Sequence, residues 1–298
     1  MRWRRWNFRW RTEGLPMCQL LGMNSSAAAS IRFSFTGFAQ RGGCTADHVD
    51  GWGIAFYEPT GARSFLDDRP ASESRLAAFV REHPIRSHNV IAHIRKATQG
   101  SVGLANTHPF SREWLGRHWF FAHNGDLQNF HPPLDGSYLP AGSTDSEKAF
   151  CYVMQWLRSV FASWQRPPTW DAIAPELAKC NAEIARHGNF NCLLTNGEAL
   201  FVHCSSQLAT LQRAHPFPRA RLVDCDLSMD LGELNGPDDR MVIIATEPLT
   251  LDETWERLDT GDTRVFVGGR QVWAHHCART RRFPVPGEAA KMMVPEAA

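Results

Sequence analysis

The sequence lacks several features that would assign it to a common class. No run of about 18 consecutive apolar residues is present, so we expect no transmembrane helix. The N-terminus lacks the apolar core of a secretory signal. None of the 8 cysteines is spaced as Cys-x-x-Cys, and a chain of 298 residues needs no disulfides to fold. These absences indicate a cytoplasmic protein with reduced thiols.

Global charge and metal-ligand patterns are also missing. The net charge of +1 gives no basic surface for nucleic acid, and no basic stripe accompanies the 11 tryptophans in the body of the chain. His275-His276-Cys277 lacks a second ligand group at the spacing of a zinc finger. We therefore expect neither a metal nor a nucleic-acid partner.

The charge that is present gathers at the N-terminus. Residues 1–16 contain five arginines, three tryptophans and one acidic residue. The tryptophans fall three and four positions apart, so a basic helix lying on a membrane is one interpretation of this segment. The stretch is short and Pro16 ends it, so we expect no membrane partner. We predict that residues 1–16 are an extension, that residues 17–276 form one domain, and that residues 277–298 are a loose tail.

Short apolar runs bounded by turn-forming residues follow the extension. Strands are predicted at residues 18–23, 51–57, 90–93, 119–123, 190–194, 199–203, 241–246, 264–267 and 271–274, the last two joined by a Gly268-Gly269 hairpin turn. Helices are predicted at residues 143–158, which open with Ser, Thr, Asp and Glu as a capped helix does, and at residues 170–187. Many strands and two or three long helices predict an α+β fold of stacked sheets with helices outside them.

Cys18 stands directly after Met17. If Met17 were the true start, its removal would leave a thiol and a free α-amine on one residue. Such an amine has a pKa of about 7.7–8.0 and can take the thiol proton near neutral pH, so that no histidine is needed. The alternative is that Cys18 is a small buried apolar residue at the start of a strand.

Three further groups carry side chains suited to binding an amino acid and an oxyanion. Arg95 follows an apolar strand and can hold a carboxylate through two parallel hydrogen bonds. Asn124-Gly125 follows another strand and can supply an amide and an unhindered backbone N–H to an oxyanion. Asp145 opens a helix and can accept from an ammonium group. Each has an ordinary alternative: a surface arginine, a turn and a helix cap.

Taken together and in this order, the motifs resemble the class II glutamine amidotransferases, in particular the members without an attached synthase domain. The resemblance covers about residues 17–274. The motifs are Met17-Cys18, Asp50-Gly51-Trp52-Gly53, His93-x-Arg95-x-Ala97-Thr98, Asn106-Thr107-His108-Pro109-Phe110, His123-Asn124-Gly125 and Thr144-Asp145-Ser146-Glu147. No single motif is specific, but the combination is.

The resemblance implies a four-layer αββα sandwich of the N-terminal-nucleophile hydrolase type. It implies that the Cys18 thiolate attacks the γ-amide of glutamine or of a γ-glutamyl compound. A thioester then forms and is hydrolysed, with release of ammonia or an amine and of glutamate. Arg95, with Thr98 nearby, would bind the substrate α-carboxylate, and Asp145 would bind its α-amino group. Asn124 and Gly125 would form the oxyanion hole, and no cofactor is implied.

The sequence departs from the family pattern in two places. Better-known members, such as the glutaminase domain of glucosamine-phosphate synthase, have Trp and His where this chain has Lys96 and Gln99. Those positions line the glutamine site in such enzymes, so the amide donor stays open between glutamine and a γ-glutamyl compound. The second departure is the extension before Cys18. It is interpreted as an upstream mis-start, as a propeptide removed by self-cleavage, or as a retained segment.

Partners and the competing function follow from the same residues. Residues 17–276 take up nearly the whole chain, so we expect no acceptor domain within it; either a partner protein receives the ammonia, or the amide is simply hydrolysed. The competing hypothesis is a non-catalytic glutamine-binding or scaffold protein with a blocked Cys18. His108 and His123, which adjoin the motifs, are expected to be hydrogen-bonded core residues rather than proton carriers.

Overall fold

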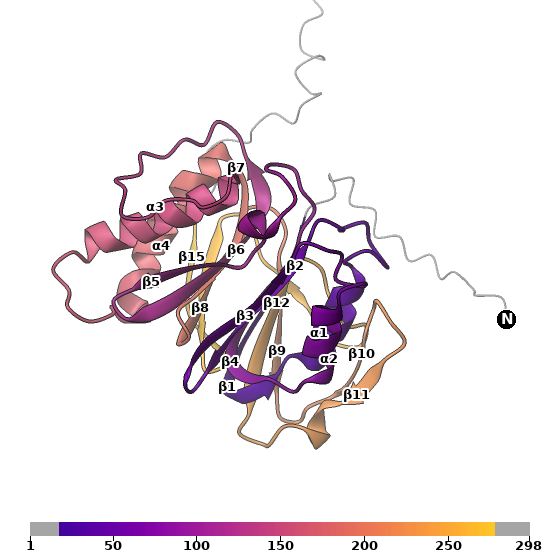
Figure 1. The fold of residues 1–298 in the computed structure, drawn as a ribbon. Helices are drawn as coiled ribbons and strands as arrows, with labels where there is room; N and C mark the ends of the chain where they lie inside the picture. Colours follow the sequence, from indigo (N-terminus) through magenta and orange to yellow (C-terminus); the bar gives the residue numbers. More distant parts are fainter. Residues whose placement is uncertain (1–17, 278–298) are drawn as a thin grey trace, which may run out of the picture.

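Two antiparallel sheets lie face to face, with helices on their outer faces (Figure 1). The computed structural model describes residues 18–277. The predicted extension and all of the predicted tail beyond Cys277 lie outside the described residues. Within residues 18–277, no helix has the length and apolarity needed to cross a bilayer.

The first sheet has seven strands. Their order is β13 (Glu256–Arg257), β9 (Ala209–Ala214), β12 (Arg240–Ala245), β1 (Gln19–Ser30), β4 (Arg86–Ile94), β2 (Trp52–Glu58) and β3 (Gly61–Asp67). Helices α1 (Arg32–Gln40) and α2 (Arg75–Glu82) cover its outer face (Figure 1). Phe35 and Phe38 of α1 are fully buried there against Trp52 and the neighbouring strands.

The second sheet has six strands. Their order is β15 (Arg270–His276), β14 (Asp262–Val267), β8 (Ala199–His203), β7 (Gly188–Thr195), β6 (Arg117–Leu127) and β5 (Phe110–Trp114). Helices α3 (Asp145–Val160) and α4 (Trp170–Ile184) cover its outer face (Figure 1). The rings of Phe121 on β6 and Phe150 on α3 stack there with centroids 5.0 Å apart. A ribbon of β10 (Arg219–Arg221) and β11 (Ser228–Asp230) lies apart from both sheets.

A third apolar layer fills the space between the sheets and completes the predicted αββα sandwich. Alternate residues of a strand point to opposite faces. Leu20 therefore packs between the sheets with Ile91, Leu193 and Ile244, whereas Leu21 packs on the helix side. Because the central strands are buried on both faces, their sequences form continuous apolar runs, and all nine predicted strands are present.

The local signals at the predicted helix and hairpin also agree with the structure. Thr144 caps α3 by accepting a hydrogen bond from the Glu147 N–H at 3.2 Å. The hairpin between β14 and β15 turns at Gly268 and Gly269, whose φ angles of 58° and 71° suit glycine. Helices α1 and α2 and strands β3, β5, β9, β10, β11 and β13 were not predicted.

Several strand ends meet at one end of the sandwich. Gln19 at the start of β1 lies opposite Ile94 at the end of β4, and Leu21 lies opposite Ala245 at the end of β12. Trp52 at the start of β2 also lies opposite Ile94. The residues flanking these positions, among them Cys18, Arg95 and Thr246, are therefore gathered from distant parts of the chain.

Candidate active site

The Cys18 thiol lies against the backbone of Lys96. Its Sγ donates to the Lys96 carbonyl at 3.2 Å and accepts from the Lys96 N–H, also at 3.2 Å. Burial raises the pKa of this thiol to about 11; the Lys96 N–H and the charge of Arg95 act against that shift, and the charge of Asp145 adds to it. The thiol is therefore protonated at neutral pH and needs a base before it can act as a nucleophile.

Arg95 is buried directly beyond β4 and organises the loop that follows. Its guanidinium donates to the carbonyls of Gln99 at 3.0 Å, Gly100 at 3.2 Å and Ser101 at 2.9 Å. A guanidinium has five N–H groups, so this arrangement leaves donors for a carboxylate. Thr98 belongs to the same loop and is exposed.

Asn124 and Gly125 lie within β6, not after a strand as predicted. Pairing with β7 extends β6 past them, because Asn124 lies opposite Asn191 and Gly125 opposite Phe190. The Asn124 side chain is fully buried, and its Nδ2 donates to Thr246 Oγ1 at 3.1 Å. Its Oδ1 has no hydrogen-bond partner among residues 18–277.

The backbone N–H of Gly125 points to the side of β6 away from β7. The opposite residue, Phe190, donates its N–H to Ser205 Oγ on the far side of β7, so the pair exchanges no hydrogen bonds between the strands. On the other side of β6, pairing with β5 stops at Phe121. A Cβ at position 125 would collide with the Asn189 carbonyl, so only glycine fits.

Asp145 is the first residue of α3, and it is held against the end of β6. Its Oδ2 accepts from the Leu127 N–H at 2.8 Å. The carboxylate is nearly buried, with 6% of the residue exposed, and it retains lone pairs for a further donor. The start of α3 thus brings a negative charge to the same end of β6 that carries Asn124 and Gly125.

The two positions that depart from the family pattern are both tied to acidic residues. Lys96 Nζ donates to Asp47 Oδ2 at 2.6 Å, and the Asp47 side chain is 73% exposed. Gln99 Nε2 donates to Asp126 Oδ1 and, at 3.3 Å, to the Leu127 carbonyl. Gln99 therefore joins the loop after Arg95 to the end of β6.

The Asp50-Gly51-Trp52-Gly53 motif holds the start of this loop through hydrogen bonds to its backbone. Asp50 Oδ2 accepts from the Ala97 N–H at 2.8 Å, and Gly51 O accepts from the Arg95 N–H at 2.8 Å. A Cβ at Gly53 would collide with the His108 carbonyl. The motif therefore fixes the backbone between Arg95 and Ala97, on which the Cys18 thiol rests.

Three histidines near the site are buried. His123 Nδ1 lies 2.8 Å from Ser146 Oγ and Nε2 lies 3.0 Å from the Asn189 carbonyl, as expected for a hydrogen-bonded core residue. His108 is likewise buried, but its ring nitrogens have no hydrogen-bond partner in residues 18–277, so the prediction was wrong about its hydrogen bonding. The ring centroids of His108 and His93 lie 4.2 Å apart. Burial lowers the pKa of both imidazoles well below the usual value, so both are neutral.

Two residues that the sequence did not single out hold Asn124 in place. Thr246 Oγ1 accepts from Asn124 Nδ2 and, at 2.9 Å, from the Leu20 N–H. Asn191 Nδ2 donates to the Asn124 carbonyl at 3.0 Å, while its Oδ1 accepts from three successive N–H groups at residues 205–207. The only available signal for Thr246 was a polar residue at the end of a predicted apolar strand.

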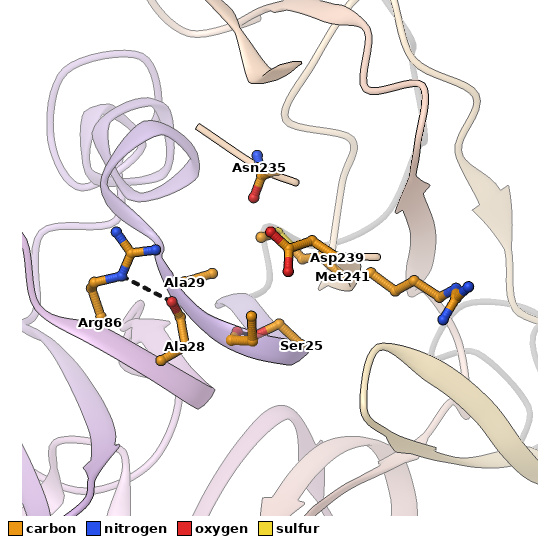
Figure 2. Close-up of a pocket in the computed structure, with 9 residues that line it drawn as sticks. Ser25, Ala28, Ala29, Arg86, Asn235, Asp239 and Met241 are labelled. Atoms are coloured by element: carbon orange, nitrogen blue, oxygen red, sulfur yellow. Dashed lines mark hydrogen bonds between the residues drawn. The ribbon is translucent and has the colours of Figure 1, made fainter. Parts of the chain in front are cut away.

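A hollow lies where β4 and β12 begin, at the end of the seven-stranded sheet opposite to Cys18. Figure 2 shows the side chains that line it. The hollow is lined by Ser25, Ala27, Ala28, Ala29, Arg86, Asn235, Asp239, Arg240 and Met241. Arg86 Nε donates to the Ala28 carbonyl at 2.9 Å (Figure 2). The hollow shares no residue with the cluster around Cys18.

Comparison with known proteins agrees with this geometry. The model of the family described as glutamine amidotransferases class-II matches residues 17–288. A protein of Escherichia coli named "Putative glutamine amidotransferase YafJ" is 43% identical over 256 residues, 86% of this chain and 100% of its own length. A Haemophilus influenzae protein named "Putative glutamine amidotransferase" is 44% identical over 256 residues, 86% of each chain.

A solved structure points the same way. The crystal structure of a predicted glutamine amidotransferase from Pseudomonas aeruginosa aligns with a TM-score of 0.65 and 39% identity, and covers 86% of this chain and 100% of that one. The family match spans most of the sequence, and relatives above 40% identity match over nearly all of their length. The chain therefore belongs to the class II glutamine amidotransferases.

Proposed function

We propose that this protein hydrolyses the γ-amide of glutamine or of a γ-glutamyl compound, with Cys18 as the nucleophile. The observation that carries the proposal is the surroundings of the Cys18 thiol. Arg95 directly precedes Lys96, whose backbone contacts the thiol, and Asp145 is held at the end of β6 that carries Asn124 and Gly125. Asn124 is joined to the strand that begins at Gln19 through a single hydroxyl, that of Thr246.

The proposed reaction begins when the residues before Cys18 are absent and its α-amine is free. The amine takes the thiol proton, and Sγ attacks the γ-carbonyl carbon. Asn124 Nδ2 and the Gly125 N–H donate to the resulting oxyanion. Collapse expels ammonia or an amine, which takes the proton, and leaves a γ-glutamyl thioester. Water then hydrolyses the thioester to glutamate and restores the thiol.

A donor panel tests this function. Protein beginning at Cys18 is incubated with glutamine, with γ-glutamyl peptides and with asparagine, and glutamate or aspartate release is measured. We expect glutamate release from at least one γ-glutamyl donor and none from asparagine, whose amide carbon is one methylene closer to the α-carbon. Release from no γ-glutamyl donor, with glutamine binding retained, would favour the non-catalytic binding protein instead.

Asp145→Ala is expected to weaken substrate binding more than it slows the chemical step. The carboxylate lies where it can pair with the substrate α-ammonium, and a charge-assisted hydrogen bond contributes about 1.5–3 kcal/mol. KM should therefore rise about 10- to 100-fold while kcat falls far less. Steady-state kinetics over a range of glutamine concentrations measure both. A variant with unchanged KM would contradict the role given to Asp145.

Asn124→Ala is expected to lower kcat by about 10²–10³-fold, because it removes one donor to the oxyanion. Substrate contacts at Arg95 and Asp145 stay in place, so KM should change little. The variant also removes the unpaired Oδ1 from the core. Rapid-quench measurement of thioester formation separates slow acylation from slow thioester hydrolysis, and an unaltered acylation rate would argue against this assignment.

The destination of the ammonia and the compartment are part of the proposal. Ammonia either leaves to solvent or passes to a separate acceptor protein, and simple hydrolysis of a γ-glutamyl amide needs no acceptor.

All eight cysteines are free thiols, which suits the reducing cytoplasm. Lys96 and Gln99, held by Asp47 and Asp126, make the rim of the site polar and favour a γ-glutamyl compound with a polar leaving group.

A further inference from the structure

We propose that Thr246 is a positioning residue that sets the direction of the Asn124 amide relative to the Cys18 thiol. The inference rests on the proposed function, in which Asn124 Nδ2 donates to the oxyanion. Thr246 directly follows β12 and is 3% exposed. Its hydroxyl oxygen accepts from two donors, the Leu20 N–H at 2.9 Å and Asn124 Nδ2 at 3.1 Å.

The two contacts join the two sheets at the site. Thr246 also donates its own N–H to the Leu20 carbonyl at 3.1 Å, so its backbone continues the pairing of β12 with β1. Leu20 lies two residues after Cys18 on the seven-stranded sheet, whereas Asn124 lies on β6 of the six-stranded sheet. The Thr246 hydroxyl therefore fixes the distance between the strand that carries the nucleophile and the amide that would stabilise the oxyanion.

The direction of the amide depends on this hydroxyl. One hydrogen of Asn124 Nδ2 is used by Thr246 Oγ1, which leaves the other for the oxyanion. Oδ1 makes no hydrogen bond within the described chain, so Thr246 supplies the side chain's one polar anchor there. Without the hydroxyl, rotation of the amide could exchange Oδ1 for Nδ2 and place an acceptor where the oxyanion forms. The loss should therefore appear in the rate of the chemical step.

The test compares Thr246→Val, which keeps the branched shape and removes the hydroxyl, with Thr246→Ser, which keeps the hydroxyl. We expect Thr246→Val to lower kcat about 10- to 100-fold, less than complete removal of the donor, with KM changed less than about twofold. Thr246→Ser should stay within about threefold of the wild-type kcat. A serine variant as slow as the valine variant would overturn the inference.

A double-mutant comparison separates positioning from a general loss of structure. If Thr246 acts through Asn124, adding Thr246→Val to the Asn124→Ala protein should lower kcat by less than about twofold further. An equal loss in both backgrounds would show that the hydroxyl does not act through the amide. Thr246→Ala serves the same comparison if the valine variant does not fold.

Alkylation of Cys18 by iodoacetamide supplies a readout that does not depend on the oxyanion. The thiol is held by Lys96 and not by Thr246, so its alkylation rate, followed by mass spectrometry of the Cys18 peptide, should be the same in Thr246→Val and wild type. Wild-type protein that turns over no γ-glutamyl donor would remove the proposed function itself. Wild-type turnover with an equally fast Thr246→Val variant would remove only the role of Thr246.

Discussion

Cys18→Ala should abolish glutamate release, with a loss of at least about 10³-fold, because it removes the thiol proposed as the nucleophile. The substitution removes only Sγ and its two contacts with the Lys96 backbone. Arg95 and Asp145 remain, so the variant should still bind glutamine, which a thermal-shift titration can measure. Turnover is measured by coupled detection of glutamate.

Cys44→Ala is the matched control, because Cys44 is exposed and is not among the groups that act on the Cys18 thiol. It should keep the wild-type rate. Glutamate release by the Cys18→Ala protein at a rate near wild type would rule out the covalent mechanism. Loss of activity in both variants would point to a general sensitivity to cysteine replacement.

A free α-amine on Cys18 is expected to be as necessary as the thiol. Burial holds the thiol pKa at about 11, so a base must remove its proton at neutral pH. The buried histidines His93 and His108 do not supply one, since the described hydrogen bonds of Sγ go to the Lys96 backbone and to neither imidazole. Protein that begins at Cys18 should be active, and protein that retains even one preceding residue should lose at least about 10³-fold in rate.

The role of the amine also predicts how kcat/KM changes with pH. The amine accepts a proton only when it is neutral, so the rate should rise as pH increases through its pKa, near 7.7–8.0 for an unperturbed amine. It should level off well below the thiol pKa of about 11. Intact mass identifies which chain is present in each preparation. Equal rates with and without one glycine inserted before Cys18 would contradict the role of the amine.

The central strands and helix α3 could be predicted from the sequence because local signals determine them. The central strands are buried on both faces and form apolar runs, and α3 has a capping residue at Thr144. Helix α1 escaped prediction because phenylalanine alternates with small polar residues in Arg32–Gln40 and Gly37 lies in its middle. Its helix depends on burial of Phe35 and Phe38 against the sheet, and no local pattern reveals that packing.

The candidate site also has residues that the sequence predicts and one that it does not. Cys18, Arg95, Asn124, Gly125 and Asp145 could be proposed because the motifs that carry them, taken together and in order, resemble one family, although each residue alone has an ordinary alternative. The contribution of Thr246 could not, since it depends on the register that places Thr246 beside Leu20, 226 positions away in sequence. Its contact with Asn124 requires in addition that the two sheets stack at that end.

Lys96 contacts the Cys18 thiol through its backbone and the rim of the site through its side chain. Both contacts with Sγ come from the peptide N–H and carbonyl of residue 96, while its side chain extends to the exposed Asp47. Any amino acid with an N–H can make those two backbone contacts. The side chain at position 96 can therefore be exchanged without displacing the thiol. A substitution of Lys96 is expected to change the rim of the site while both backbone contacts with Sγ stay in place.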